Sequence, residues 1–359
     1  MIGIGRVCTD QGPSVVSISD DLVFDVCEVC PTVAHWLSGR VSIDVISSFR
    51  EYPLGSPESL TWLSPFDLQP IKACGVTFIT SLLERLVEEL AHGDSKNVEA
   101  IRENLGATLF DQIRNMIPGS PEAMTLRERL LAQNAWSPYL EVGLGKDPEI
   151  FTKAPPLSAL GNKCIAGLLN ESEWNNPEPE IVLAINSVGK VLGATLGNDV
   201  NLRDIEGRSA LLLGRAKDNR GSTVIGPWIR VFDQSCMLRD IAESSLTLEI
   251  DGADGFAVSE SQNLTGLKRG FDALVDALFD QHDYPDGAAL FTGSAFAPVW
   301  DRFGEGSGFT HVDGDRIRIS CPLIGELTHE VQRCPTLAPW EFGLLELMRN
   351  LSARKLLQN

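Results

Sequence analysis

Apolar and polar positions follow a helical period in two stretches of the chain. Over residues 79–90, apolar side chains recur every three or four positions, which places them on one face of a helix. A second helix is announced by Ser120 as N-cap, Pro121 at the first helical position and Glu122 near the positive end. This helix is predicted to end near Gln133.

Shorter runs bounded by turn residues predict strands on both sides of these helices. Residues 13–26 alternate β-branched runs with polar turns. After about residue 135, strands are predicted at 181–185, 190–196, 245–250 and 316–320. One helix interrupts them, with Leu267, Phe271, Leu274, Val275 and Leu278 on one face, and a closing helix is predicted over 340–355.

This pattern predicts an α+β protein of two parts. We expect a smaller N-terminal αβ domain over residues 1–135 and a larger strand-rich domain over residues 136–359. The boundary is placed only to within about ten residues, because element ends are the least certain part of such a prediction.

The charge of the chain restricts its partners. It carries 30 Lys and Arg against 49 Asp and Glu, a formal net charge of −19. Binding to nucleic acid or to an anionic membrane needs a basic face, and the sequence offers none. A small anionic substrate is compatible with this charge if its site supplies positive charge from a metal ion or from a few Lys and Arg side chains.

No stretch of the sequence reads as a targeting or membrane-spanning segment. The first residues lack the basic and apolar regions of a signal peptide, and no apolar run has the length that spans a bilayer. The eight cysteines are scattered, and Cys27 and Cys30 form a lone C-x-x-C without a second pair, so reduced thiols are the simpler interpretation. We therefore expect a cytoplasmic protein.

Three carboxylates are spaced so that one ion can bind them together. Glu178 and Glu180 lead into the strand at 181–185, and residues two apart point to the same face of a strand. Asp199 follows a second strand, which we interpret as the hairpin partner of the first. Three carboxylates with open positions suit Mg²⁺ or Mn²⁺. A solvated, acidic strand face is the alternative interpretation in so acidic a chain.

Further motifs follow one another in a recognisable order. They are Phe-Thr-Lys-Ala-Pro-Pro at 151–156, Pro-Glu-Pro-Glu at 177–180, Asn-Asp-Val-Asn-Leu-Arg-Asp at 198–204, Ala-Lys at 216–217, Ile-Gly-Pro-Trp at 225–228, Phe-Thr-Gly-Ser at 291–294, Gly-Asp-Arg-Ile at 314–317 and Ile-Gly-Glu-Leu at 324–327. In this order the chain resembles the fumarylacetoacetate hydrolase superfamily, and over nearly its full length the sugar-acid dehydratase branch. The resemblance implies a β-sandwich-like roll for the larger domain and a lid-type helix in the smaller one.

The resemblance also implies roles for individual residues. Glu178, Glu180 and Asp199 would ligate the metal. The 2-oxo-carboxylate of the substrate would be held by Arg203, Lys217, Thr292, Gly293, Ser294 and Lys153. Four of these residues have a structural alternative. Lys217 could be a surface lysine, Thr292 a turn residue, Arg203 the partner of a neighbouring acid, and Lys153 the end of its strand.

One departure from the family pattern bears on the reaction. Hydrolase members carry an Asn-Tyr…His-x-x-Glu lid, whose His–Glu dyad activates water. Here the matching positions are Thr77, Phe78, Ser81 and Glu84. A serine hydroxyl without a partner is a poor general base near neutral pH, whereas a neutral imidazole is suited to the task. The departure disfavours C–C hydrolysis and favours a reaction whose proton transfers use lysine or carboxylate.

Dehydration is such a reaction. The expected substrate is a 2-keto-3-deoxy-pentonate derived from xylonate or arabinonate, converted to 2-oxoglutarate semialdehyde by enolate formation at C3 and loss of the C4 hydroxyl. Glu149 and Lys217 are the candidates for base and acid, with Glu84 in reserve. The alternatives are an acylpyruvate-type C–C hydrolase, an oxaloacetate decarboxylase, and a non-catalytic binding homologue. A homodimer or homotetramer is expected from the resemblance alone, and the C4 configuration stays open.

Overall fold

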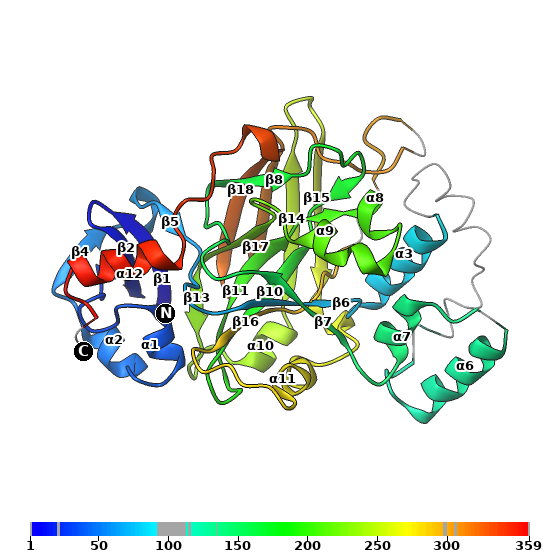
Figure 1. The fold of residues 1–359 in the computed structure, drawn as a ribbon, viewed down its shortest axis with the longest axis horizontal. Helices are drawn as coiled ribbons and strands as arrows, with labels where there is room; N and C mark the ends of the chain where they lie inside the picture. The colour runs from blue at the N-terminus through cyan, green and yellow to red at the C-terminus, as the bar shows by residue number, and fades with distance from the viewer. Residues whose placement is uncertain are drawn as a thin grey trace.

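The fold is built on two stacked β-sheets, shown as a ribbon in Figure 1. The computed structural model describes residues 2–19, 22–91, 113, 116–133, 135–296, 300–304 and 307–357. A strand-rich sandwich with helices at its ends is the α+β architecture that the sequence predicts.

The larger sheet runs through most of the molecule in the order β4-β3-β2-β1-β13-β11-β10-β16-β6-β7, with β5 paired to β1. Neighbours are antiparallel except β6 and β16, which are parallel. The strands are β1 (Gly3–Thr9), β2 (Gly12–Ser19), β3 (Leu22–Asp25), β4 (Tyr52–Gly55), β5 (Trp62–Leu63), β6 (Ile71–Gly75), β7 (Glu149–Ala154), β10 (Pro179–Ile185), β11 (Val191–Asp199), β13 (Thr223–Val231) and β16 (Ala288–Phe291).

This sheet crosses the domain boundary predicted near residue 135 in two places. The N-terminal strand β1 pairs with β13, where Gly3 lies opposite Arg230. Strand β6 pairs with both β16 and β7, so residues 71–75 lie between two strands of the larger predicted domain. The hydrogen bonding of the sheet therefore joins the two parts, and the division into domains stays a prediction.

The second sheet has the order β15-β14-β17-β18-β8 and packs on the first. Its strands are β8 (Cys164–Leu168), β14 (Ser245–Asp251), β15 (Ala257–Asn263), β17 (Arg316–Cys321) and β18 (Gly325–Arg333). In β17 the buried residues Ile317 and Ile319 alternate with the exposed Arg316 and Arg318, because successive side chains of a strand point to opposite faces.

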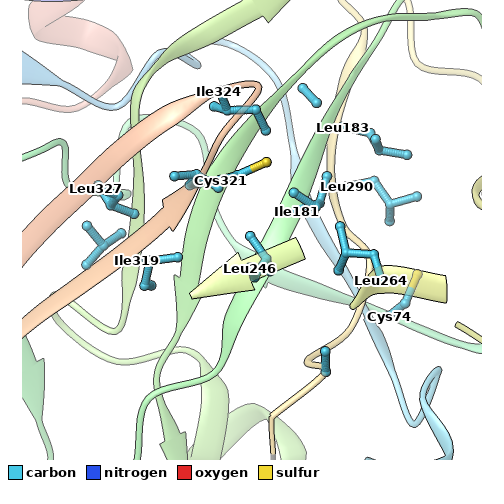
Figure 2. Packing of buried hydrophobic residues seen from close by; sticks show 14 of the residues in the cluster. Cys74, Ile181, Leu183, Leu246, Leu264, Leu290, Ile319, Cys321, Ile324 and Leu327 are labelled. Atoms are coloured by element: carbon cyan, nitrogen blue, oxygen red, sulfur yellow. The ribbon is translucent and has the colours of Figure 1, made fainter. Parts of the chain in front are cut away.

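The main core lies between these two sheets. Figure 2 shows Ile181, Leu183 and Leu290 of the larger sheet among Leu246, Ile319 and Leu327 of the second. Each of the latter three is completely buried. Burial of a side chain of this size stabilises the fold by about 1.5–3 kcal/mol. This core fixes β10 and β11, the strands that carry the predicted metal ligands.

In Figure 1, α1, α2 and α12 lie near the N-terminal strands, α3, α6 and α7 lie at the far end, and α10 and α11 lie below the middle of the sheets. Their bounds are α1 (Val33–Leu37), α2 (Ile43–Ser48), α3 (Ile79–Leu90), α6 (Pro121–Ala132), α7 (Pro138–Leu144), α8 (Arg203–Glu206), α9 (Leu213–Lys217), α10 (Leu238–Ala242), α11 (Phe271–Phe279) and α12 (Leu344–Ala353). Short 3-10 turns lie at Pro57–Ser59, Ala210–Leu212, Leu264–Gly266 and Cys334–Thr336. Within the described ranges, no helix has the length and apolar character needed to cross a bilayer.

Two helix predictions are confirmed and two need correction. Helix α11 begins at Phe271, so Leu267 lies before it, at the end of the 3-10 turn Leu264–Gly266. Helix α3 has the predicted bounds, and the Ser120 hydroxyl caps α6 by accepting a hydrogen bond from the Ala123 N–H at 3.2 Å. The closing helix begins at Leu344 rather than at Trp340. In the segment before the helix, residues 340–343, the indole N–H of Trp340 donates to the carbonyl of Phe342.

Helix α12 packs on the N-terminal strands. Leu347 and Leu351 form a cluster with Cys27, and the Asn350 amide donates to the carbonyl of Gln11 at 2.7 Å. Arg354 donates to the carbonyl of Pro13 at 2.8 Å. The last helix of the fold therefore covers its first strands.

Candidate active site

The three predicted metal ligands converge at one end of the β10–β11 hairpin. The register pairs Pro179 with Asn198, and the Asp199 N–H donates to the carbonyl of Glu178 at 3.0 Å, so Asp199 lies opposite Glu178. One oxygen from each of Glu178, Glu180 and Asp199 lies within 4.8 Å of the others, and all three residues are buried. The predicted convergence is confirmed.

These carboxylates line a small, largely enclosed cavity of about 20 Å³, enough for one or two water molecules. The lining residues are Cys74, Gly75, Val76, Ser81, Arg85, Glu149, Phe151, Glu178, Glu180, Asp199, Glu206, Lys217 and Ser294. Of the other predicted site residues, Glu149, Lys217 and Ser294 take part in this lining. Arg85 and Glu206 take part as well, although the sequence did not suggest a role for either.

Two cations reach the carboxylates from helices. The guanidinium of Arg85, on α3, donates through Nη2 to Glu178 Oε1 at 2.5 Å, and its Nη1 lies 3.3 Å from Glu206 Oε2. Lys217, the last residue of α9, donates through Nζ to Glu178 Oε2 and lies 3.2 Å from Asp199 Oδ2. Both oxygens of Glu178 thus have a cationic partner.

Local packing directs Arg85 into the cavity. Leu82 and Leu86 of α3 pack against Leu140 and Leu144 of α7. Side chains four residues apart share a helix face, so Ser81 and Arg85 both face the cavity. This spacing was the signal in the sequence that could have identified Arg85.

The donor set fits a hard divalent cation. Five carboxylates and two cations line the cavity, which leaves a formal charge of −3. Burial, together with the charges of Asp199 and Glu178, raises the pKa of Glu180 well above its usual range. Asp199 Oδ1 is buried without a hydrogen-bond partner among the described residues, although Lys153 Nζ lies 3.3 Å from it. Carboxylate oxygens of this kind are the preferred ligands of Mg²⁺.

The pKa values of Glu149 and Lys217 are both raised. Burial raises the pKa of Glu149, while Arg85 and Lys217 partly counter that effect. Burial also disfavours the charged form of Lys217, but Asp199, Glu178 and Glu206 outweigh it and raise the pKa of the lysine. In the cluster as it stands, Lys217 is protonated and Glu149 is a stronger base than an exposed glutamate.

The position of Glu149 depends on a glycine in the adjacent strand. Glu149 begins β7 and pairs with Gly75, the last residue of β6. A Cβ atom on Gly75 would overlap the Glu149 carboxylate, so the absence of a side chain there makes room for it. This requirement was not foreseen from the sequence.

The Thr-Gly-Ser segment after β16 acts mainly through its backbone. The N–H of Gly293 donates to Glu180 Oε2 at 2.6 Å, which fixes one metal-ligand candidate. The hydroxyl of Thr292 donates to the carbonyl of Ile181 at 3.1 Å, and Thr77 donates to the carbonyl of Thr292 at 2.7 Å. Ser294 alone of the three lines the cavity, and the substrate-binding roles of Thr292 and Gly293 stay predictions.

Three other predicted residues lie outside the cavity lining. Arg203 donates through Nε to Asn176 Oδ1 at 2.6 Å and stacks over Trp174. Lys153 is completely buried behind Asp199, with Ser222 as a hydrogen-bond partner. Glu84, half-buried on α3, is not among the lining residues. Their roles in substrate binding or catalysis stay predictions.

A side-chain bridge connects the metal-ligand hairpin to the second sheet. Asn198 accepts a hydrogen bond from the Glu178 N–H at 2.9 Å, and its amide nitrogen lies 2.8 Å from His329 Nε2 on β18. Because the oxygen of Asn198 is taken by an N–H, its NH₂ must donate to His329, and His329 Nε2 must accept. Burial, aided by His311, lowers the pKa of His329 to about 3, in agreement with a neutral ring.

Comparison with known proteins shows what the chain resembles. Residues 185–332 match the family described as fumarylacetoacetate (FAA) hydrolase C-terminal. The chain is 31% identical over 186 residues, 52% of its length, to a 2-dehydro-3-deoxy-D-arabinonate dehydratase of Saccharolobus solfataricus, and 31% identical over 193 residues, 54% of its length, to a probable 2-keto-3-deoxyxylonate dehydratase of Haloferax volcanii. The aligned segments span 59% and 63% of these two relatives.

The fold matches over a longer range than the sequence. The structure of a 2-keto-3-deoxy-D-arabinonate dehydratase complexed with magnesium and 2,5-dioxopentanoate superposes with a TM-score of 0.62 and 21% identity, covering 92% of this chain and 99% of that one. The predicted fold is therefore confirmed. Residues 185–332 match the fumarylacetoacetate hydrolase family model, and the chain is similar to the two sugar-acid dehydratases.

Proposed function

We propose that this protein is a Mg²⁺-dependent dehydratase that converts a 2-keto-3-deoxy-pentonate to 2,5-dioxopentanoate, which is 2-oxoglutarate semialdehyde. The observation that carries the proposal is one cavity in which Glu178, Glu180 and Asp199 meet beside the acid–base candidates Glu149 and Lys217. The names of the two relatives and the product in the similar structure support this substrate class.

The chain's own residues divide the reaction between them. Glu178, Glu180 and Asp199 would hold the metal, which would act as a Lewis acid towards the C2 carbonyl of the substrate and make the C3 proton more acidic. Glu149, whose pKa burial raises, takes the proton from C3. Lys217, which the surrounding carboxylates keep protonated, gives its proton to the C4 hydroxyl as the C4–O bond breaks and water leaves. Tautomerisation of the unsaturated product gives the aldehyde.

The lid residue Ser81 argues against the C–C hydrolase alternative. It lines the cavity, but its hydroxyl donates to the carbonyl of Phe78 at 3.3 Å within its own helix. Among the residues that the structure describes, it is not paired with a group that would turn it into a base for water. Oxaloacetate decarboxylation needs only the metal and the 2-oxo acid, so the experiment below includes it as a separate outcome.

Several finer expectations belong to the proposal as well. They are the use of Mn²⁺ in place of Mg²⁺, assembly into a homodimer or homotetramer, a cytoplasmic location, and a role in pentose catabolism. The similar structure with magnesium supports Mg²⁺ as the first metal to test. The xylonate- and arabinonate-derived substrates differ at C4 and are tested side by side.

Product analysis by mass spectrometry tests the proposal. The purified chain is incubated with Mg²⁺ and each C4 epimer of 2-keto-3-deoxy-pentonate, with and without EDTA, beside acetylpyruvate and oxaloacetate. We expect EDTA-sensitive loss of one water from one epimer, with both controls unchanged. Cleavage of acetylpyruvate or loss of CO₂ from oxaloacetate, without dehydration, would refute the dehydratase. Unchanged turnover in Glu149→Gln or Lys217→Met with metal still bound would refute the assigned roles.

A further inference from the structure

We propose that Arg85, on helix α3, binds the carboxylate of the 2-oxo acid and is the specificity-determining cation of the site. This inference rests on the proposed function, because it takes a metal-bound 2-oxo acid as the ligand. It assigns to Arg85 the role that the sequence had suggested for Arg203.

Cations bind both carboxylate oxygens of Glu178. Arg85 Nη2 lies 2.5 Å from Oε1, and Lys217 Nζ binds Oε2, so cations hold both oxygens of this metal-ligand candidate. A divalent ion that binds Glu178 competes with at least one of them. Lys217 also lies 3.2 Å from Asp199 and is drawn to the same cluster. Arg85 belongs to helix α3. If it releases Glu178, another acceptor must replace that carboxylate.

A second ion pair, with Glu206, keeps Arg85 at the cavity when its contact with Glu178 is lost. Its Nη1 lies 3.3 Å from Glu206 Oε2, and the side chains of both residues are less than a tenth exposed. Glu206 is the last residue of α8, whereas Arg85 belongs to α3. This buried ion pair with Glu206 keeps Arg85 at the cavity lining, beside the proposed metal ligand Glu178.

The incoming ligand supplies the carboxylate that Arg85 loses when it releases Glu178. A buried guanidinium that loses one carboxylate is stable only if another acceptor takes its place. A 2-oxo acid brings a carboxylate into this cavity, and its two coplanar oxygens match the two N–H groups on one edge of the guanidinium. Arg85 therefore exchanges the carboxylate of Glu178 for that of the substrate, and Glu206 holds it in place during the exchange.

The location of Arg203 supports the same assignment. Arg203 lies outside the cavity lining, where it binds Asn176 and lies over the ring of Trp174. Among the described residues that line the cavity, Arg85 and Lys217 are the cations, and Lys217 is the proposed proton donor. Arg85 is then the lining residue suited to hold the carboxylate without taking part in proton transfer.

Calorimetry on the full chain tests the proposal without turnover. Mg²⁺ is titrated first, and oxalate, an unreactive 2-oxo acid mimic, is titrated next at saturating Mg²⁺. The variants are Arg85→Met, Arg85→Lys, and the control Arg349→Met, which removes an exposed helical arginine paired with Glu346. Far-ultraviolet circular dichroism and thermal unfolding check the fold of each variant.

We expect Arg85→Met to weaken oxalate binding by roughly 10- to 150-fold, the usual loss for a charged hydrogen bond. Its affinity for Mg²⁺ alone should be equal to or tighter than wild type, because no guanidinium then competes for Glu178. Arg85→Lys should fall between wild type and Met for oxalate, and Arg349→Met should match wild type in both titrations.

A purely structural role gives a different result. Parallel weakening of Mg²⁺ and oxalate in both Arg85 variants, or unchanged oxalate affinity, would overturn the proposal. So would a wild-type chain that binds Mg²⁺ but not oxalate. If wild type binds oxalate through Arg85 yet dehydrates neither pentonate, the proposed reaction fails while the carboxylate site stands.

Discussion

Two walls of the cavity carry opposite charge and are built in different ways. The sheet wall holds Glu149, Glu178, Glu180 and Asp199, all on or next to strands of the larger sheet. The helix wall holds the two cations, Arg85 of α3 and Lys217 of α9, together with Glu206 of α8. Backbone hydrogen bonds place the acids, whereas side-chain packing between helices places the cations.

This difference shows how a cluster of repelling charges is kept together. Strand register leaves the carboxylates little freedom to separate, and the Gly293 N–H and the Asn198 side chain fix Glu180 and the backbone of Glu178 from behind. The helix wall supplies the compensating charge and can respond to ligands. We therefore expect changes in the sheet wall to abolish metal binding or catalysis, and changes in its supports to have smaller effects.

The largest effect is expected from removal of a metal-ligand charge in the sheet wall. Asp199→Asn should abolish Mg²⁺ binding at millimolar concentrations and lower turnover by roughly 10³-fold or more, because the metal supplies the main charge stabilisation. Calorimetry and product formation measure the two effects. The control is Glu326→Gln, an exposed carboxylate on β18. Wild-type Mg²⁺ affinity in Asp199→Asn would exclude this cluster as the metal site.

A smaller loss is expected from the acid–base residue of the same wall. Glu149→Gln keeps the size of the side chain but cannot accept a proton, so kcat should fall by about 10²- to 10³-fold. The Mg²⁺ affinity should stay within a few-fold of wild type, which separates this variant from Asp199→Asn. Steady-state kinetics and calorimetry on one preparation give both numbers. A loss of metal affinity equal to the loss of kcat would instead make Glu149 part of the metal cluster.

The glycine next to Glu149 provides a milder test of the same wall. A Cβ atom in Gly75→Ala must displace the Glu149 carboxylate, and a misplacement of about 1 Å costs up to about 10²-fold in rate. We expect kcat to fall while Mg²⁺ binding is retained. Gly343→Ala is the matched control, because a Cβ there meets no atom within 4 Å. Full activity in Gly75→Ala would mean that the position of Glu149 is unimportant.

The smallest effect is expected behind the sheet wall, at His329. Burial depresses its pKa to about 3, so between pH 6.5 and 3 the unfolded chain binds more protons at this residue than the folded chain. The free energy of unfolding must therefore fall as the pH falls through this window. His329→Gln keeps an acceptor for Asn198 but does not titrate, and between pH 7 and 5 it should lose about 2 kcal/mol less stability than wild type.

Urea unfolding at pH 7, 6 and 5 measures this difference. His282→Gln, at an exposed histidine, is the control and should follow the wild-type dependence on pH. Parallel curves for wild type and His329→Gln would show that His329 is already protonated in the folded protein, contrary to its position as acceptor for Asn198.

The contrast between the sheet wall and the helix wall explains which residues of the site could be predicted from the sequence. Glu178, Glu180 and Asp199 were predictable because strand alternation and a hairpin are local patterns. The bounds of α3 followed from its apolar period. The spacing of Arg85 from Ser81 places both on one helix face, but its contact with Glu178 was not predictable, because Glu178 is 93 positions away and the contact depends on how α3 packs on α7. The start of the closing helix was misplaced because residues 340–343, where the Trp340 indole donates to the Phe342 carbonyl, lie outside the helix.

Helix α12 and strand β13 determine when the N-terminal strands can complete their structure during synthesis. Strand β1 is synthesised before its partner β13, which ends at Val231, and before α12, which covers the strands and ends at Ala353. Until both have left the ribosome, the edge of β1 that pairs with β13 is incomplete and Cys27 lacks its apolar cover. These strands therefore reach their final structure only after residue 353 has been synthesised, and until then their unpaired edge can pair with other strands.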